Sequence, residues 1–299
     1  MIRLDNISKT FRDGDTQVQA LKNISFEVNK GELVAIIGKS GSGKSTLLNI
    51  LGLLDKQTDG DYYIDGKKVS SIPEREKAKL RNSHIGFVMQ DFALVEKYTV
   101  KQNINIPLIY TDKPINKEKA INDVLKSVGL SDKTNTPAYK LSGGQKRRVA
   151  VAGVMAMKPR ILVLDEPAAG LDPEGRDDIL SEVKEYHKKT GTTVLLVSHS
   201  MEDIAKYANR VLVMSNKKIA MYDTVEKVFA RAPELLELGL SVPQVTKIFL
   251  KLREMGVDVP ADVYTIPYAV KTLLEAKRRR DAGESLVLPR SAAQKGGAV

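Results

Sequence analysis

The first third of the chain arranges apolar and polar positions in short runs that end at turn residues. Val18–Val28 alternates, which is typical of a strand with one buried face, whereas Leu33–Ile37 is a continuous apolar run typical of a strand buried on both faces. Glycine beside aspartate or asparagine marks the turns between the runs. The strands predicted in this region are Met1–Ser8, Val18–Val28, Leu33–Ile37, Asp61–Ile64 and Ile85–Gln90.

Helical patterns alternate with extended ones further along the chain. Strands are predicted at Ile161–Leu164, Thr193–Ser198 and Arg210–Ser215. Strands that alternate with helices form parallel βα units covered by helices, so this pattern predicts an α/β fold. The predicted helices up to this point are Lys44–Leu54, Val100–Ile109, Lys117–Val128, Arg147–Met157, Arg176–Lys189 and Met201–Asn209.

The last segment differs from the rest. Apolar residues recur at helical spacing from Val245 to Met255, between Pro243 and Gly256, which predicts an amphipathic helix with ordinary start and stop signals. A second helix is expected from Thr265 to about Arg280. Residues 281–299 are small, polar and unperiodic, so we expect them to form a disordered tail.

Composition limits the classes of protein to which the chain can belong. Its 299 residues, 42% of them hydrophobic, are enough to bury a sizeable core. There is no cysteine, which excludes disulfides and Cys-based zinc sites and suits a reducing cytosol. No apolar run reaches the roughly 20 residues that span a bilayer, so we expect membrane contact only through a partner. The net charge of +10 favours a polyanionic ligand: nucleotide phosphates, nucleic acid or anionic lipid.

A phosphate-binding loop is the first candidate for chemistry. Residues 38–45, GKSGSGKS, match G-x-x-x-x-G-K-[ST] between a buried strand and a helix. Glycines allow successive backbone N–H groups to turn toward a phosphate, and the helix start adds its positive dipole end. Lys44 is expected to reach the β and γ oxygens of ATP, and Ser45 to ligate Mg²⁺. The predicted nucleotide-binding residues are Gly38, Ser40, Gly41, Ser42, Gly43, Lys44, Ser45 and Thr46.

Polar side chains also follow three buried strands. Asp165 and Glu166 end the strand that starts at Ile161, and His199 ends the strand that starts at Thr193. Ligands of α/β proteins bind at this carboxyl edge. We expect Asp165 to hold Mg²⁺ and Glu166 to polarise the attacking water. His199 is predicted to contact the γ-phosphate, and Gln90 to join the shell of Mg²⁺ or water.

The segment Leu141–Gln145, LSGGQ, is the most specific motif in the chain. With the phosphate loop upstream and Asp165-Glu166 downstream, the chain resembles the ATP-binding subunit of ATP-binding cassette (ABC) transporters. The resemblance covers about Met1–Tyr222. It implies a P-loop core sheet, an antiparallel β subdomain and a helical subdomain at about residues 91–158. Residues 223–280 would then form a helical extension and 281–299 the tail.

In that family two cassettes face each other head to tail. Ser142, Gly143, Gly144 and Gln145 precede or begin a helix and can face a γ-phosphate, but one chain has one loop and one such motif, so the phosphate would belong to a second cassette. The resemblance makes Phe11 the aromatic that stacks on adenine, Gln90 the Q-loop glutamine, Asp172 the D-loop aspartate and His199 the switch histidine. Ala168 departs from the family pattern, which often has Thr there.

The two halves of the chain resemble different subfamilies. Residues 1–140 are similar to cassettes of macrolide-export and lipoprotein-release systems, and residues 141–285 to energy-coupling factor (ECF) ATPases, which power uptake of vitamins and metal ions. We expect an ATPase at the cytoplasmic face of the membrane that drives a separate permease, with uptake favoured and export as the alternative. Both natural divergence and a composite origin remain open. The apolar face of Val245–Met255 either joins two cassettes or packs on its own cassette.

Other functional classes fit less well. An ATPase that acts on DNA or ribosomes shares both motifs, but the chain between Gln90 and Leu141 is too short for a coiled-coil or zinc insertion. A small-molecule kinase has no need of Leu141–Gln145. The basic run Lys146–Arg148 is interpreted as a solvated helix face, since no aromatic residues are interleaved to stack bases. We therefore expect no nucleic-acid partner.

Overall fold

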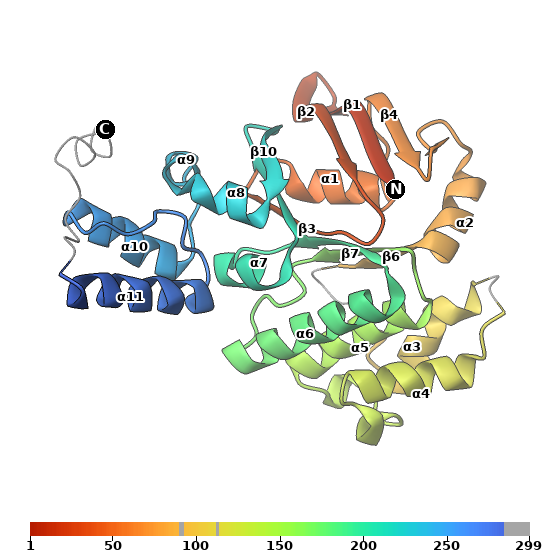
Figure 1. The fold of residues 1–299 in the computed structure, drawn as a ribbon. Coiled ribbons are helices and arrows are strands. Elements are labelled where there is room, and N and C mark those ends of the chain that lie inside the picture. The colour runs from red at the N-terminus through yellow and green to blue at the C-terminus, as the bar shows by residue number, and fades with distance from the viewer. Residues whose placement is uncertain (90–92, 112–113, 284–299) are drawn as a thin grey trace. The chain divides into compact units, whose positions relative to one another are not determined.

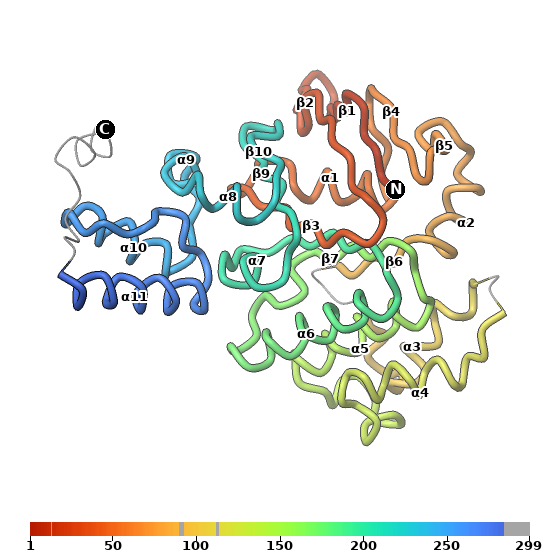
Figure 2. Tube along the Cα trace, in the orientation of Figure 1, coloured from red at the N-terminus to blue at the C-terminus, as the bar shows by residue number. Residues whose placement is uncertain are grey.

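The computed structural model describes residues 1–89, 93–111 and 114–283 (Figures 1 and 2). The chain divides into two compact units. The first unit contains Met1–His199 and Leu212–Tyr222, and the second contains Ser200–Val211 together with the residues from Asp223 onward. The division therefore assigns Ser200–Val211 to the second unit, although the sequence pattern places this segment within the cassette.

An antiparallel sheet occupies one side of the first unit, with strand order β2-β1-β4-β5. In its register Ile2 pairs with Val28 on one side and with Ile64 on the other. β1 continues five residues beyond the predicted end at Ser8, because bulges let it remain paired with β2 as far as Asp13. The strands are β1 Ile2–Asp13, β2 Thr16–Val28, β4 Asp59–Ile64 and β5 Lys67–Lys68.

A six-stranded sheet forms the centre, in the order β10-β9-β3-β8-β7-β6. β3 pairs in parallel with β8, β8 with β7, and β7 with β6. The carboxyl ends of these four strands therefore share one edge of the sheet, as the sequence pattern predicts. The strands are β3 Leu33–Gly38, β6 Ile85–Val88, β7 Ile161–Asp165, β8 Thr193–Val197, β9 Arg210–Ser215 and β10 Lys218–Thr224.

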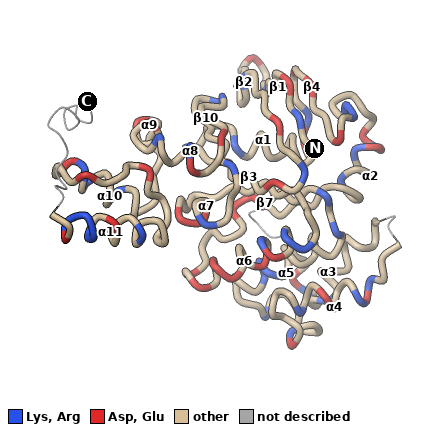
Figure 3. The backbone as a smooth tube through the Cα atoms, viewed as in Figure 1, with Lys and Arg blue, Asp and Glu red and all other residues tan. Residues whose placement is uncertain are grey.

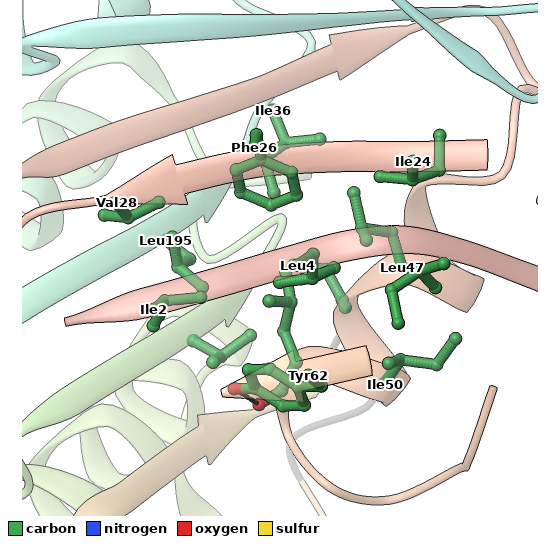
Figure 4. Close-up of a cluster of buried hydrophobic side chains, with 14 of the residues drawn as sticks. Ile2, Leu4, Ile24, Phe26, Val28, Ile36, Leu47, Ile50, Tyr62 and Leu195 are labelled. Carbon is green, nitrogen blue, oxygen red and sulfur yellow. Dashed lines mark hydrogen bonds between the residues drawn. The ribbon is translucent and has the colours of Figure 1, made fainter. Parts of the chain in front are cut away.

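Helix α1 (Lys44–Leu51) lies between the two sheets (Figure 1). Its residues Leu47 and Ile50 pack with Ile2, Leu4 and other side chains from both sheets in the main core (Figure 4). Tyr62 donates a hydrogen bond from its hydroxyl to the Leu51 carbonyl at 2.9 Å, which satisfies the one polar atom of this buried ring. The core therefore fixes the helix that follows the phosphate loop.

The remaining helices of the first unit are α2 Glu74–His84, α3 Val100–Ile109, α4 Lys117–Ser127, α5 Gly143–Ala156 and α6 Pro173–Thr190. Helix α2 was not predicted, because it buries only Lys77 and so has no apolar stripe. Helix α1 ends at Leu51 rather than Leu54, since Gly52 caps it and Leu53 turns to a positive φ of 56°. Acidic and basic residues are interspersed along helices such as α6 (Figure 3).

The second unit contains five helices among the described residues, one before β9 and four after β10. They are α7 Met201–Tyr207, α8 Val225–Ala230, α9 Ala232–Glu237, α10 Gln244–Glu254 and α11 Ile266–Asp281. The predicted apolar face of α10 divides in two. Phe249 is buried in a small core with Val259, Val263 and Ala269, whereas Ile248 and Met255 stay exposed. Part of this face thus packs within the extension. Of the expected tail, residues 284–299 lie outside the described residues.

Within the part of the chain that the structure describes, no helix has the length and apolarity needed to cross a membrane.

Candidate nucleotide-binding site

The loop between β3 and α1 has a shape that only glycine permits at two positions. A Cβ atom at Gly38 would lie 2.5 Å from the carbonyl oxygen of Met214 and 2.5 Å from Ser42 Oγ. Gly43 has φ of +101°, and a Cβ there would lie 2.6 Å from the Ala20 carbonyl oxygen. The two glycines let the backbone close into a tight turn, which ends at the N-terminus of α1.

Lys44 folds back over this loop. Its Nζ donates hydrogen bonds to the carbonyl oxygens of Gly38 at 2.7 Å and Lys39 at 3.1 Å. Burial lowers the pKa of Lys44, while the charges of Glu166 and Asp165 oppose that shift. The ammonium is therefore held at the loop and experiences the field of both acids at the sheet edge. A phosphate would replace the two carbonyl oxygens with stronger, charged acceptors.

The carboxyl edge of the sheet brings the predicted acids and histidine together. Glu166 Oε1 lies 2.9 Å from His199 Nε2. Burial raises the pKa of Asp165, and the neighbouring Glu166 charge raises it further, whereas Lys44 and His199 lower it. Glu166 has a positive φ of 51°, an uncommon conformation for glutamate that its N–H bond to the Val197 carbonyl holds in place. This strained turn points to a functional position.

Ser142 and Gln145 build the start of α5. The Ser142 hydroxyl accepts from the Gln145 N–H at 3.3 Å, and the Gln145 side chain accepts from the Ser142 N–H at 3.0 Å. This reciprocal capping box fixes the serine at the helix end. The side-chain Oε1 of Gln145 is thereby occupied within its own chain. A Cβ at Gly143 would meet nothing within 4 Å, so the backbone there is open to a ligand.

The LSGGQ segment opens onto a hollow of its own. Its described lining residues include Ser142, Gly143 and Gly144 from one side and the segment up to Asp172 from the other, and none of residues 38–46 is among them. The hollow at the LSGGQ segment therefore shares no lining residue with the phosphate loop of the same chain. Phe11 lies near the end of β1 with 45% of its surface exposed. Gln90 lies outside the described residues.

Arg147 corrects the expectation of a solvated basic face. Lys146 and Arg148 pair with Glu96 and Asp178, but Arg147 is buried and donates from Nη1 to the Ala169 carbonyl oxygen. Burial lowers the pKa of Arg147, and the charge of Glu166 opposes this shift. The sequence contained a signal for its burial, since Arg147 shares a helix face with buried Val151 and Met155 at a spacing of four residues.

The loop also contains a buried hydroxyl group that suits a phosphate ligand. The hydroxyl oxygen of Ser42 is buried and has no hydrogen-bond partner among the described residues. A buried polar atom of this kind normally has a partner in the functional state. The tight glycine turn, the free hydroxyl and Lys44 together suit a phosphate group.

Comparisons with known proteins give the family. The ABC transporter model matches residues 21–169. The energy-coupling factor transporter ATP-binding protein EcfA2 of Caldanaerobacter subterraneus is 39% identical over 93% of this chain and 98% of its own length. The methionine import ATP-binding protein MetN of Escherichia coli is 38% identical over 77% of this chain and 67% of its own length. The similarity to ECF proteins therefore extends well beyond residues 141–285.

Solved structures agree with this result. The dimeric post-hydrolysis structure of the ATP-binding cassette MJ0796, bound to ADP and Pi, has a TM-score of 0.71 and 34% identity over 75% of this chain and 99% of that chain. The structure of cbiO1 from Clostridium perfringens, part of the transporter complex cbiONQ, has a TM-score of 0.69 and 30% identity over 85% of this chain and 96% of that chain. The predicted α/β P-loop fold is confirmed, and the chain belongs to the ABC transporter family as an ATP-hydrolysing cassette.

Proposed function

We propose that the chain is the ATPase subunit of an ECF-type transporter, in which two cassettes enclose two ATP molecules and drive a separate membrane permease. The relatives named ECF ATP-binding proteins support this assignment. The single observation that carries the two-cassette arrangement is that the hollow at Ser142 includes none of the phosphate-loop residues 38–46 of the same chain in its lining. A γ-phosphate held at the loop of one cassette is then capped by Ser142 and Gly143 of the other.

Hydrolysis relies on the pair Glu166 and His199. Glu166 accepts a proton from the attacking water or orients it, and His199, 2.9 Å from Glu166 Oε1, fixes that carboxylate from the next strand. Lys44 neutralises the β and γ oxygens. Mg²⁺, when bound, would be held by Ser45 and Asp165 with Gln90, and would offset the phosphate charge.

The permease is proposed to dock at an apolar hollow of the helical subdomain. This hollow lies between the end of β6 and helices α3 and α5, where Met89, Ile106, Pro107, Val149 and Val154 contribute to its lining. Met89 is 52% exposed. An apolar groove next to the end of β6 can receive an amphipathic helix from a membrane protein, and movement there is transmitted along β6 to the catalytic edge.

The extension is proposed to pair with the extension of a second cassette. Ile248 of α10 and Met255, which caps that helix, are exposed, as are four apolar residues of α11: Ile266, Val270, Leu273 and Leu274. Their number and spacing indicate a helix face that is covered in the functional assembly. Pairing here would hold two cassettes together when no nucleotide is bound. The alternative is that this face of the extension packs on its own cassette.

Substitution of the catalytic acid tests the arrangement. Glu166→Gln should bind ATP normally, hydrolyse it about 10²- to 10³-fold more slowly, and accumulate as an ATP-bound dimer in which the LSGGQ segment of each cassette covers the ATP of the other. Lys44→Ala should lose ATP binding. Wild-type turnover in Glu166→Gln would remove Glu166 from its proposed role.

The transporter type is tested by purifying the tagged chain from membranes and identifying the permease that accompanies it. An ECF transmembrane component with a vitamin- or metal-binding subunit supports uptake at the cytoplasmic face of the membrane. An export permease would contradict it.

A further inference from the structure

Lys9 is a buried charged residue that the hydrolysis mechanism does not use. It lies in β1, and only 11% of its side chain is exposed. Its Nζ donates to Asp55 Oδ1 at 2.7 Å and to the Lys56 carbonyl oxygen at 2.7 Å. A buried ammonium with two short, specific acceptors is held in one position, because moving it would leave a buried charge without a partner.

The same ammonium faces the ring of Phe11. Lys9 Nζ lies 4.7 Å from the centroid of the Phe11 ring, within the range of a cation–π contact. Residues 9 and 11 point to the same face of β1, which brings the two side chains side by side. Phe11 is nevertheless 45% exposed, so the cation covers part of the ring and leaves surface available to a ligand.

Asp55 connects this contact to the phosphate loop. The Asp55 N–H donates to the carbonyl oxygen of Asn49 at 3.1 Å, in the last turns of α1. Asp55 Oδ1 also accepts from the Lys56 N–H at 2.7 Å, which fixes the carboxylate itself. The position of Lys9 is therefore set from the far end of the helix that begins at the phosphate loop.

We propose that Lys9 is a positioning residue for the purine base of ATP: pinned by Asp55, it holds the Phe11 ring in place for a base to stack on its exposed surface. This inference rests on the proposed contact of Phe11 with adenine. A ring that is already ordered loses less conformational freedom when the base stacks on it, so the contact improves affinity without Lys9 touching the nucleotide.

The test separates the base from the phosphates. Dissociation constants of ATP and of inorganic tripolyphosphate, which has no base, are measured by calorimetry on the full-length chain and its variants. Lys9→Met should weaken ATP binding about fivefold, because the freed Phe11 ring would have to be ordered when the base stacks on it, and should leave tripolyphosphate binding unchanged. Lys9→Arg keeps a cation and should restore most of the ATP affinity. Lys67→Met, at an exposed lysine of the same sheet, is the matched control and should change neither constant.

A double-mutant cycle tests the route through Phe11. Phe11→Leu should weaken ATP but not tripolyphosphate, and adding Lys9→Met to it should cause no further loss. Asp55→Asn removes the charge that pins Lys9 with little change of shape, and provides a second variant with the same expected pattern should Lys9→Met fold poorly.

Each other outcome has a distinct meaning. If Phe11→Leu leaves ATP affinity unchanged, the proposed base contact fails. If Phe11→Leu weakens ATP while Lys9→Met and Asp55→Asn do not, the base contact stands and the positioning role is overturned. Equal losses of ATP and tripolyphosphate in Lys9→Met, or additive losses in the double variant, also overturn it.

Discussion

His199 Nε2 and Glu166 Oε1 lie 2.9 Å apart, although the two residues follow different strands and are separated by 33 positions in the sequence. The contact joins the ends of β7 and β8, which are paired in parallel up to Asp165 and Val197. Glu166 reaches it from a left-handed backbone turn. The Glu166 carboxylate is thus held from two directions, by its own left-handed turn and by the imidazole that follows the neighbouring strand.

Removing the imidazole should therefore disorder the acid without affecting nucleotide binding. We expect His199→Ala to lower kcat for ATP hydrolysis about 10²-fold, with the dissociation constant of ATP nearly unchanged. Steady-state hydrolysis and equilibrium binding check the two parts. His187→Ala is the control, since His187 Nδ1 lies 2.7 Å from the Thr192 carbonyl oxygen and has no proposed part in hydrolysis. A large loss of ATP binding in His199→Ala would contradict the prediction.

Gly143→Ala tests whether the LSGGQ segment of one cassette covers the γ-phosphate bound by the other, without disturbing the fold. A Cβ at this position meets nothing within 4 Å, so Gly143→Ala should fold and bind ATP as the wild type does. The added methyl group would stand where the γ-phosphate of a second cassette docks, and should prevent the ATP-dependent pairing of Glu166→Gln. Size-exclusion chromatography with ATP measures this. The control is Ser131→Thr, which adds a methyl group to an exposed site of the same subdomain and should pair normally. Normal ATP-dependent pairing of Gly143→Ala would contradict the proposed contact of the LSGGQ segment with the γ-phosphate.

The exposed apolar face of the extension predicts a dimer that does not need nucleotide. Introducing a charge at its centre, in the double variant Ile248→Glu and Leu274→Glu, should weaken that dimer at least about 100-fold, because two carboxylates would be buried without partners. Sedimentation of the nucleotide-free chain measures the effect. Lys247→Glu places the same residue at a polar position and should leave the dimer intact. A wild-type chain that is monomeric without ATP would contradict the proposed pairing.

Glu182 predicts a pH dependence of stability. Burial in α6 raises its pKa to about 7, with Arg148 opposing the shift, and its Oε2 has no hydrogen-bond partner among the described residues. The folded state thus binds this proton more tightly than the unfolded state does. The resulting stability is complete below pH 4.5 and is lost as the pH rises through 7.

Glu182→Gln should therefore raise the free energy of unfolding at pH 8 by about 1–2 kcal/mol, a figure reduced for partial solvent screening, and should change it little at pH 4.5. Urea denaturation at both pH values measures the difference. Glu185→Gln, at an exposed position of the same helix, is the control. An equal effect of Glu182→Gln at both pH values would show that the charge of Glu182 is not responsible.

The sequence alone was enough for the α/β class, the parallel central strands and the phosphate loop. These features depend on local order: a continuous apolar run, a fixed spacing of glycines, and polar residues directly after a strand. Val100–Ile109 and Arg210–Ser215 were predicted to the residue, because their apolar patterns end at clear boundaries. Helix α2 was missed, since a helix that buries a single lysine has no apolar period to detect.

Only the tertiary structure decided which side chains meet. Arg147 belongs to a basic run in the sequence, yet α5 turns it toward the Ala169 carbonyl and away from water. Lys9 and Asp55 are 46 positions apart, and no local pattern relates them. The apolar stripe of α10 was evident from spacing, but its division into a buried and an exposed part depends on the segment that folds over it. A short-range pattern predicts the elements, because helical periodicity and strand alternation are set by neighbouring residues in the chain. Packing decides the partners of buried charges, because desolvation acts through space, whatever the separation in the sequence.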